Sequence, residues 1–304
     1  MIYVHLGSWK TATTTVQQLL RQGEKPLRRQ SAFFVDQRSE SHLSDFQPKF
    51  RRAIKAIQGR SRDVTARIDD AANVFLSLSR DGSRGTAVHS WEGLLGHPLK
   101  SSKDVMYHAE ATAEWFEPIV RRADVRFVLT IRKQEDLVEA MYGQEVRKGR
   151  ANYGIDRFLW EWLPKDLSWE RVITPFASRF GKDRIRVVPF ESIRSGPRKF
   201  VQAVLGDAVN ASALGEPAHS NPSFSHVAVE IARAAVPFLE PADIAKLEKF
   251  LQDNFSNLTH RRSEFLTPTL RRLVQERYGD SNRSIFREHM PDYDPVSLGY
   301  MTAT

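Results

Sequence analysis

One lysine and a group of threonines lie close to the start of the chain. Residues 7–14 read Gly-Ser-Trp-Lys-Thr-Ala-Thr-Thr and follow the apolar run 2–6. When a strand leads into a tight loop that opens a helix, free N–H groups and the helix dipole attract anions. Lys10 would add a positive charge, and further donors would come from the hydroxyls of Thr11, Thr13 and Thr14. The segment predicts an anion-binding loop; the alternative is an ordinary threonine-rich helix N-cap.

A second cation follows the most apolar segment of the chain. Residues 125–131 read Val-Arg-Phe-Val-Leu-Thr-Ile, as expected of a buried central strand, and Arg132 comes directly after them. Ligands of parallel α/β sheets bind outside the carboxyl ends of the strands. Arg132 would therefore lie at the ligand-binding edge. The alternative is a structural salt bridge with Glu135 or Asp136 on the next turn.

Strand and helix patterns alternate through the first two thirds of the chain. Strands are predicted over residues 2–6, 32–35, 86–89, 125–131 and 185–190. Helices are predicted from Thr15 and over residues 46–57, 64–78, 135–148, 155–163, 169–180 and 198–205. This alternation predicts an α/β fold with a central parallel sheet and flanking helices. We expect residues 1–212 to form this core and residues 213–304, which show no strand pattern, to form a helical C-terminal lobe packed on it as part of one structural domain.

The overall composition narrows the classes of partner. The 304 residues include 45 lysines and arginines against 37 aspartates and glutamates, a net charge of +8, which favours anionic partners. The absence of cysteine excludes disulfide scaffolds, thiolate metal sites and cysteine nucleophiles. No helix-turn-helix, RNA-recognition or zinc-finger pattern indicates a nucleic-acid partner. Without an apolar run of membrane-spanning length or a signal peptide, we expect a cytoplasmic protein. The oligomeric state stays open.

The loop and the strand-end arginine together resemble a known family. The string 5–14, His-Leu-Gly-Ser-Trp-Lys-Thr-Ala-Thr-Thr, is similar to the 5′-phosphosulfate loop of bacterial sulfotransferases, which use 3′-phosphoadenosine-5′-phosphosulfate (PAPS) and have a P-loop NTPase-like fold. The family pattern usually has glycine where this chain has Ala12. Its second signature binds the 3′-phosphate through an arginine, matched by Arg132, and a serine about two helical turns later, where this chain has Ala140. The resemblance implies PAPS-binding roles for Gly7, Ser8, Trp9, Lys10, Thr11, Ala12, Thr13, Thr14, Arg132 and the Ala140 position.

The same resemblance implies a reaction. A sulfuryl group would pass from PAPS to a hydroxyl or amine of an acceptor, with a carbohydrate or glycolipid as our first expectation. Lys10 would stabilise the leaving phosphate, and no metal would be required. Glu92, just after strand 86–89, would be the general base, with His89 as the second candidate. The alternative for both is structural: a solvated loop glutamate and a buried strand histidine.

Two other functions are compatible with parts of this pattern. Ala140 lacks the hydroxyl of the family serine, so a catalytically decayed binder of nucleotides or sulfated ligands is one alternative. An ATP-dependent phosphotransferase is the other. It would require the Walker A pattern, with a second glycine directly before the lysine, and an acidic residue for magnesium after a strand. The sequence shows neither feature.

Overall fold

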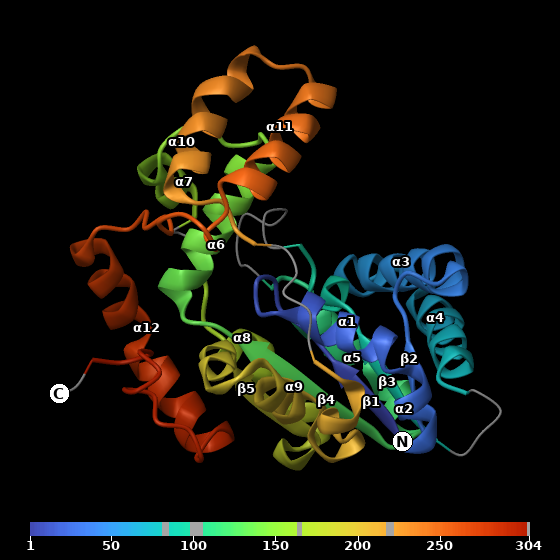
Figure 1. Cartoon of the computed structure of the whole chain (residues 1–304). Helices are drawn as coiled ribbons and strands as arrows, with labels where there is room; N and C mark the ends of the chain where they lie inside the picture. Colours follow the sequence, from blue (N-terminus) through green and yellow to red (C-terminus); the bar gives the residue numbers. More distant parts are fainter. Residues whose placement is uncertain (81–84, 98–105, 163–165, 217–221, 303–304) are drawn as a thin grey trace.

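The central sheet is entirely parallel, as the sequence predicts. The computed structural model describes residues 1–80, 85–97, 106–162, 166–216 and 222–302. Five strands run in the order β2-β3-β1-β4-β5 (Figure 1). They are β1 (Ile2–His5), β2 (Ala32–Val35), β3 (Thr86–Ser90), β4 (Val125–Ile131) and β5 (Ile185–Pro189), each within one residue of its predicted range.

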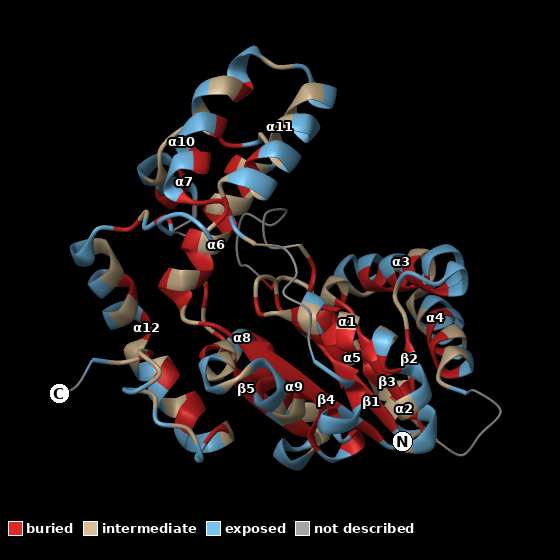
Figure 2. Cartoon of the chain, in the orientation of Figure 1, coloured by how far each residue is buried: buried red, intermediate tan, exposed pale blue. Residues whose placement is uncertain are grey.

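Helices cover both faces of this sheet. Neighbouring residues of a strand point to opposite faces, so Tyr3 and Val128 pack on one helical layer and Val4 and Phe127 on the other. The first layer comprises α1 (Thr13–Gln22), α2 (Glu24–Arg29) and α9 (Pro197–Leu205). The second comprises α3 (Gln47–Gln58), α4 (Val64–Leu78), α5 (Ala109–Val120) and α8 (Glu170–Phe180). Figure 2 shows that burial concentrates in the sheet and on the inner sides of these helices.

Helix α5 is the one long element that the sequence does not predict. Most of its side chains are buried, including Trp115 and Phe116, and Pro118 lies inside it. A helix that is apolar on most of its circumference has no clear polar face, and an internal proline normally argues against a helix. The usual sequence pattern of an amphipathic helix is therefore missing here.

The C-terminal part of the chain is helical, as predicted. Beyond residue 212, the described residues form no strand; backbone bridges join only Phe224 to Ser256 and Ser225 to Arg262. The remaining helices are α6 (Gln134–Arg147), α7 (Ile155–Trp162), α10 (His226–Ala235), α11 (Pro241–Asn254) and α12 (Pro268–His289). Both α10 and α12 pack against α6, which leaves the core beyond β4 (Figure 1). Short helical turns are η1 (His42–Phe46), η2 (Glu92–Leu95), η3 (Lys182–Arg184), η4 (Phe190–Ser195), η5 (Gly206–Ala208), η6 (Ala211–Leu214) and η7 (Val236–Phe238).

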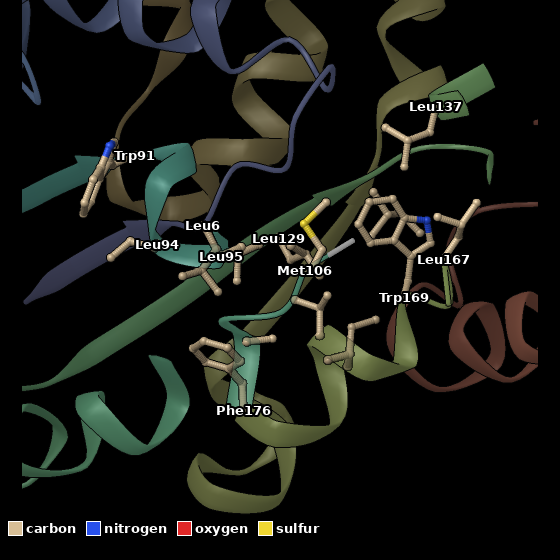
Figure 3. Packing of buried hydrophobic residues seen from close by; sticks show 14 of the residues in the cluster. Leu6, Trp91, Leu94, Leu95, Met106, Leu129, Leu137, Leu167, Trp169 and Phe176 are labelled. Carbon is tan, nitrogen blue, oxygen red and sulfur yellow. The ribbon is translucent and has the colours of Figure 1, made fainter. Parts of the chain in front are cut away.

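An apolar cluster supports the point where β4 passes into α6. Trp169 is buried beside Leu137 and Met106 (Figure 3). Its indole Nε1 donates a 2.8 Å hydrogen bond to the backbone oxygen of Arg132. The backbone that carries Arg132 is thus fixed by packing and by a buried hydrogen bond. In the described part of the chain, no helix combines the length and apolar character that crossing a bilayer requires.

Candidate functional site

A cleft of about 470 Å³ lies at the carboxyl ends of the strands, between the sheet and the helices around α6. Most of the residues predicted for the site line it: Trp9, Lys10, Thr11, Ala12, Thr13, Thr14, Glu92, Arg132 and Ala140. Gly7 and Ser8, the first two residues of the loop, are not among the residues that line the cleft, and Ser8 is fully buried. The cleft therefore brings together segments from the start of the chain, at Trp9, and from its C-terminal region, at Phe265.

Internal hydrogen bonds hold the loop between β1 and α1 in shape. The Ser8 hydroxyl donates to the backbone oxygen of Thr130 on β4, at 2.9 Å. The Thr11 hydroxyl donates to the backbone oxygen of Ser8 at 2.7 Å, and the Thr13 hydroxyl reaches the same oxygen at 3.4 Å. The Thr11 hydroxyl is thus directed into the loop, which differs from the expectation that it faces an anion. Thr14 lines the cleft and makes no side-chain hydrogen bond to a described residue.

Two non-glycine residues of the loop adopt left-handed backbone conformations. Lys10 has φ 64° and Ala12 has φ 58°. A Cβ atom makes this region costly, by roughly 1–2 kcal/mol per residue. The glycine that the family pattern has at position 12 would carry no such cost, so Ala12 is strained where glycine would not be. Gly7 is required for a different reason, since a Cβ there would lie 2.6 Å from Thr13 Oγ1.

The turn at Ala12 leaves the start of α1 open. Helix α1 begins at Thr13 without a side-chain cap, so N–H groups of its first turn have no partner within the helix. These donors and the positive end of the helix dipole face the cleft that Thr13 and Thr14 line. The loop therefore offers backbone donors to an anion, as predicted. The threonine-rich N-cap of the alternative reading is not formed.

Arg132 connects the two predicted anchors directly. Its Nη1 donates a 2.8 Å hydrogen bond to the backbone oxygen of Lys10, and its guanidinium lies 4.7 Å from the centre of the Phe190 ring. Its Nε is buried with no hydrogen-bond partner in the described part of the chain. The predicted alternative, a salt bridge to Glu135 or Asp136, is not seen. Those carboxylates are bound by other side chains, those of Lys133, Arg271 and Gln275.

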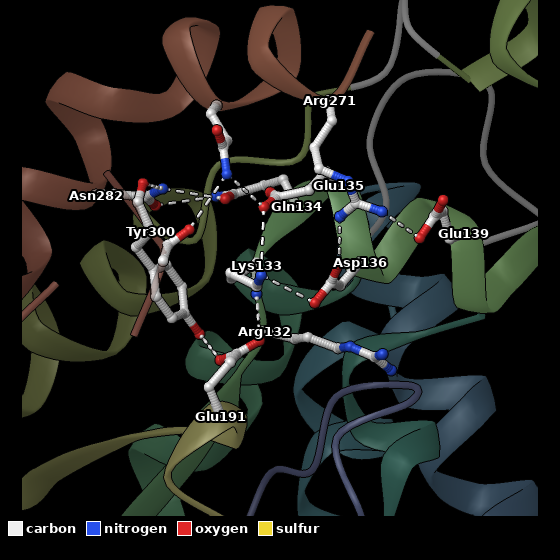
Figure 4. Close-up of polar contacts among 12 residues, drawn as sticks. Arg132, Lys133, Gln134, Glu135, Asp136, Glu139, Glu191, Arg271, Asn282 and Tyr300 are labelled. Carbon is white, nitrogen blue, oxygen red and sulfur yellow. Dashed lines mark hydrogen bonds and ion pairs between the residues drawn. The ribbon is translucent and has the colours of Figure 1, made fainter. Parts of the chain in front are cut away.

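A polar network fixes the backbone on which Arg132 stands (Figure 4). One oxygen of Glu191 accepts a hydrogen bond from the backbone N–H of Lys133 at 3.1 Å, and the other accepts from the Tyr300 hydroxyl at 2.6 Å. The side chains of Gln134 and Asn282 exchange two hydrogen bonds of 3.0 and 3.1 Å. Figure 4 shows the Arg132 side chain extending away from this network. The C-terminal region thus holds the start of α6 in place.

Lys10 and Glu92 have environments that shift their pKa values toward neutrality. Burial, together with the charges of Arg147 and Arg132, lowers the pKa of Lys10 to about 8, against an opposing effect of Glu92. Burial raises the pKa of Glu92, and a hydrogen bond from Thr13 and the charge of Lys10 oppose that rise. A carboxylate whose pKa is raised toward the working pH is suited to general-base chemistry. Glu92 begins the turn η2 just beyond β3, so the end of that strand positions it.

His89, the second candidate base, lies outside the cleft. Its ring stacks on Phe75 at 4.2 Å, and its Nε2 is 2.8 Å from the Ser79 hydroxyl. Burial lowers its pKa to about 3. Phe75 and Ser79 belong to α4 and its C-cap, in the helical layer behind the sheet. Strand alternation directs the His89 side chain to that face. The structure therefore corrects the sequence reading: His89 is a buried strand histidine, and Glu92 is the candidate that lines the cleft.

Several lining residues were not predicted from the sequence. Arg147 shares a face of α6 with Ala140, and the helical spacing could have indicated it. Arg262 and Ser263 come from a loop of the C-terminal region, where no local pattern marks them. The hydroxyl of Ser263 is buried without a hydrogen-bond partner among the described residues. This hydroxyl is a hydrogen-bond donor in the same cleft as Ala140, whose side chain has no donor.

Comparisons with known proteins give similarities in fold. No protein-family model matches the chain, and no curated protein matches its sequence. A sulfotransferase from Alicyclobacillus acidocaldarius is 17% identical, with a TM-score of 0.42 over 82% of this chain and 94% of that one. A retinol dehydratase solved with androsterone and the inactive cofactor PAP is 11% identical, with a TM-score of 0.37 over 94% of this chain and 80% of that one. The sulfotransferase domain from the curacin biosynthetic pathway is 12% identical, with a TM-score of 0.35 over 86% of this chain and 98% of that one.

Proposed function

We propose that this protein is a PAPS-dependent sulfotransferase that transfers a sulfuryl group to a hydroxyl or amine. The observation that carries the proposal is the hydrogen bond between Arg132 and the backbone oxygen of Lys10, at the carboxyl edge of a parallel sheet. It joins the two segments whose sequences separately resemble the 5′-phosphosulfate loop and the 3′-phosphate signature. An uncapped helix start in the same cleft supplies the backbone donors that such a loop needs.

The donor groups of the cleft fit a nucleotide with anions at both ends. Lys10 and the first-turn N–H groups of α1 would hold the 5′-phosphosulfate. Arg132, whose Nε lacks a partner among the described residues, would hold the 3′-phosphate. The buried hydroxyl of Ser263 would replace the serine that the family pattern has at Ala140. A lost hydroxyl contact costs on the order of 1 kcal/mol, so such a substitution keeps 3′-phosphate binding feasible.

Two side chains would carry the reaction. The sulfur–oxygen bond to the 5′-phosphate breaks as a new bond forms to the acceptor oxygen, and PAP leaves. The Lys10 ammonium would stabilise negative charge on the leaving phosphate oxygen. The Glu92 carboxylate would take the acceptor's hydroxyl proton, since it lines the cleft and its pKa is raised by burial. Carbohydrates and glycolipids are the acceptors to examine first.

Calorimetry with PAP and with ATP and magnesium tests the function. We expect PAP to bind, ATP to bind much more weakly, and a Lys10→Met variant to lose at least about tenfold in PAP affinity because a charge-assisted contact is removed. A Lys25→Met variant, altered on the exposed surface of α2, is the matched control. No PAP binding at high micromolar concentration would refute the proposal. PAP binding without transfer from PAPS to any acceptor in a broad panel would favour the decayed binder instead.

Cellular and domain-level expectations accompany this proposal. We propose that the protein acts in the cytoplasm, which fractionation of cells would test.

We also propose that residues 1–212 and 213–304 unfold together as one structural domain. The apolar cluster that includes Tyr142 on α6 and Val229 on α10 supports this expectation. A single transition in both calorimetric and spectroscopic unfolding is the expected result.

A further inference from the structure

The cleft has more positive charge than the proposed donor contacts use. Its described lining includes four cations, Lys10, Arg132, Arg147 and Arg262. Only two carboxylates, Glu92 and Glu139, line it. Of these, Glu139 is already bound, because it accepts from the N–H groups of Phe265 and Leu266 and pairs with Arg271. Without an anionic ligand, this cluster of cations repels itself.

Helix α6 places these groups at two separate points along the cleft. Ala140, Gly143, Gln144 and Arg147 all line it, at the spacing of one helical face. Seven residues separate Ala140 from Arg147, so their Cα atoms lie about 10 Å apart along the helix axis. Ala140 is the position of the 3′-phosphate signature. Arg147 therefore lies well beyond the position proposed for the nucleotide's 3′ end.

The guanidinium of Arg147 is only weakly engaged by the protein. Its Nε lies 3.5 Å from Glu248 Oε1, yet it makes no hydrogen bond to any residue that the structure describes. Glu248 is committed to Lys148, which donates to both of its oxygens at 2.9 and 3.0 Å. The side chain of Arg147 is nonetheless mostly buried, with 18% of it exposed. A mostly buried cation whose ion pair is long and shared with a second cation favours binding of a further anion.

Lys10 faces the same space. Burial is the largest cause of its lowered pKa, and the charge of Arg147 comes next, ahead of Arg132. An anion bound beside Arg147 would thus lie close to the position where Lys10 supports the leaving phosphate and Glu92 meets the acceptor. Gln144, one turn before Arg147 on the same face, adds an amide donor there.

We propose that Arg147, assisted by Gln144, determines acceptor specificity by binding a carboxylate or other anionic group of the acceptor near its reacting hydroxyl. This inference rests on the proposed function and narrows its acceptor class to hydroxyl compounds that carry a negative charge. The planar guanidinium suits such a group because its paired N–H donors match two carboxylate oxygens. Neutral alcohols of the same shape would leave the arginine with only its shared ion pair to Glu248.

Two pairs of compounds test this in the PAP-saturated protein. The first pair is p-nitrophenyl β-D-glucuronide and p-nitrophenyl β-D-glucoside, and the second is p-hydroxybenzoate and p-cresol. In calorimetry, we expect the anionic member of at least one pair to bind about 10- to 100-fold more tightly, as for a charged hydrogen-bonded contact. Arg147→Gln should remove that preference, and Arg147→Lys should retain part of it. Lys148→Gln is the matched control, since Lys148 is more exposed, does not line the cleft, and glutamine keeps a donor for Glu248.

The outcomes separate this inference from the proposed function. PAP affinity of Arg147→Gln close to that of the unchanged protein shows that the variant is folded and that the donor site is intact. If neither pair shows a preference for the anion, or if the preference survives Arg147→Gln, the inference is wrong while the proposed function stands. If PAP itself does not bind, the proposed function fails. The same pairs, measured without nucleotide in both proteins, then still decide whether Arg147 selects the anion.

Discussion

Arg132 donates a 2.8 Å hydrogen bond from Nη1 to the backbone oxygen of Lys10, so the cation at the end of β4 braces the loop after β1. Lys10 has a left-handed backbone conformation, with φ 64°, and this bond helps to hold it. The two proposed phosphate anchors are therefore mechanically linked. A substitution of Arg132 should therefore also alter the position of Lys10.

Replacing Arg132 with methionine should weaken PAP binding in a way that depends on the 3′-phosphate. The unchanged protein should prefer PAP over AMP, and Arg132→Met should lose most of that preference, by about 10- to 100-fold. Calorimetric titration of both nucleotides measures it. A residual loss of AMP affinity would report the loosened Lys10 loop. If affinity for PAP and AMP fell by the same factor, Arg132 would be a brace for the loop and not a 3′-phosphate ligand.

Replacing Ala12 with glycine should stabilise the protein. Ala12 has φ 58°, and relief of the left-handed strain should outweigh the added freedom of the unfolded chain by about 0.5–1 kcal/mol. Chemical denaturation measures the change. Ala245→Gly, at an exposed interior position of α11, is the control and should destabilise by about 1 kcal/mol. Equal destabilisation by both changes would mean that Ala12 is not strained.

PAP affinity should fall as the pH rises through about 8. Burial lowers the pKa of Lys10 to about 8 in the ligand-free protein. The ammonium form binds an anion and the neutral amine does not, so affinity is complete below this pH and declines above it. Titrations between pH 7 and 9.5 should show the decline in the unchanged protein and a flat profile in Lys10→Met. A flat profile in both proteins would exclude a role for the Lys10 charge.

Replacing Glu92 with glutamine should abolish most of the transfer rate and leave PAP binding intact. Loss of a general base typically costs 10²- to 10⁴-fold in rate. In the unchanged protein, the rate should also fall as the pH drops, because burial raises the pKa of Glu92 and the protonated acid cannot accept a proton. Stopped assays with PAPS at several pH values test both points. An unchanged rate in Glu92→Gln would assign the base elsewhere.

The buried histidines should make the fold sensitive to acid. Burial lowers the pKa of His89 from 6.5 to about 3, so the unfolded chain takes up a proton below pH 6.5 that the folded chain refuses until about pH 3. Stability is therefore lost as the pH falls through this window, by up to about 1.4 kcal/mol per pH unit. His89→Gln should flatten the dependence of unfolding free energy on pH.

The sequence predicted the sheet well because its strands are short, apolar and followed by distinct loops. It placed β4 at 125–131, as observed, since a buried parallel strand is apolar almost throughout. Local strings also marked the two segments that the structure brings together at Lys10 and Arg132. The distinction between Glu92 and His89 could not be made in this way. It depends on which face of β3 each side chain meets and on the helix packed behind that face.

Other parts of the site depend on long-range packing. Arg147 is an ordinary charged helix residue in the sequence, and its position in the cleft follows from how α6 leaves the sheet. Ser223 and Ser263 reach the cleft from loops that only the packing of α10 on α6 brings close. No local spacing marks such residues. Sequence reasoning therefore located the segments that we propose bind the donor and missed Arg147, which we propose contacts the acceptor.

The hydrogen bond between Tyr300 and Glu191 has a consequence for how the protein matures. Chains fold from the N-terminus as they are synthesised, and the sheet is encoded by residues 2–189. The Glu191 carboxylate, which holds the backbone beside Arg132, accepts its second hydrogen bond from Tyr300, near the C-terminal end of the described residues. A nascent chain would carry a complete sheet without the Tyr300–Glu191 hydrogen bond until residue 300 had left the ribosome. The backbone beside Arg132 would gain its full support only after that point.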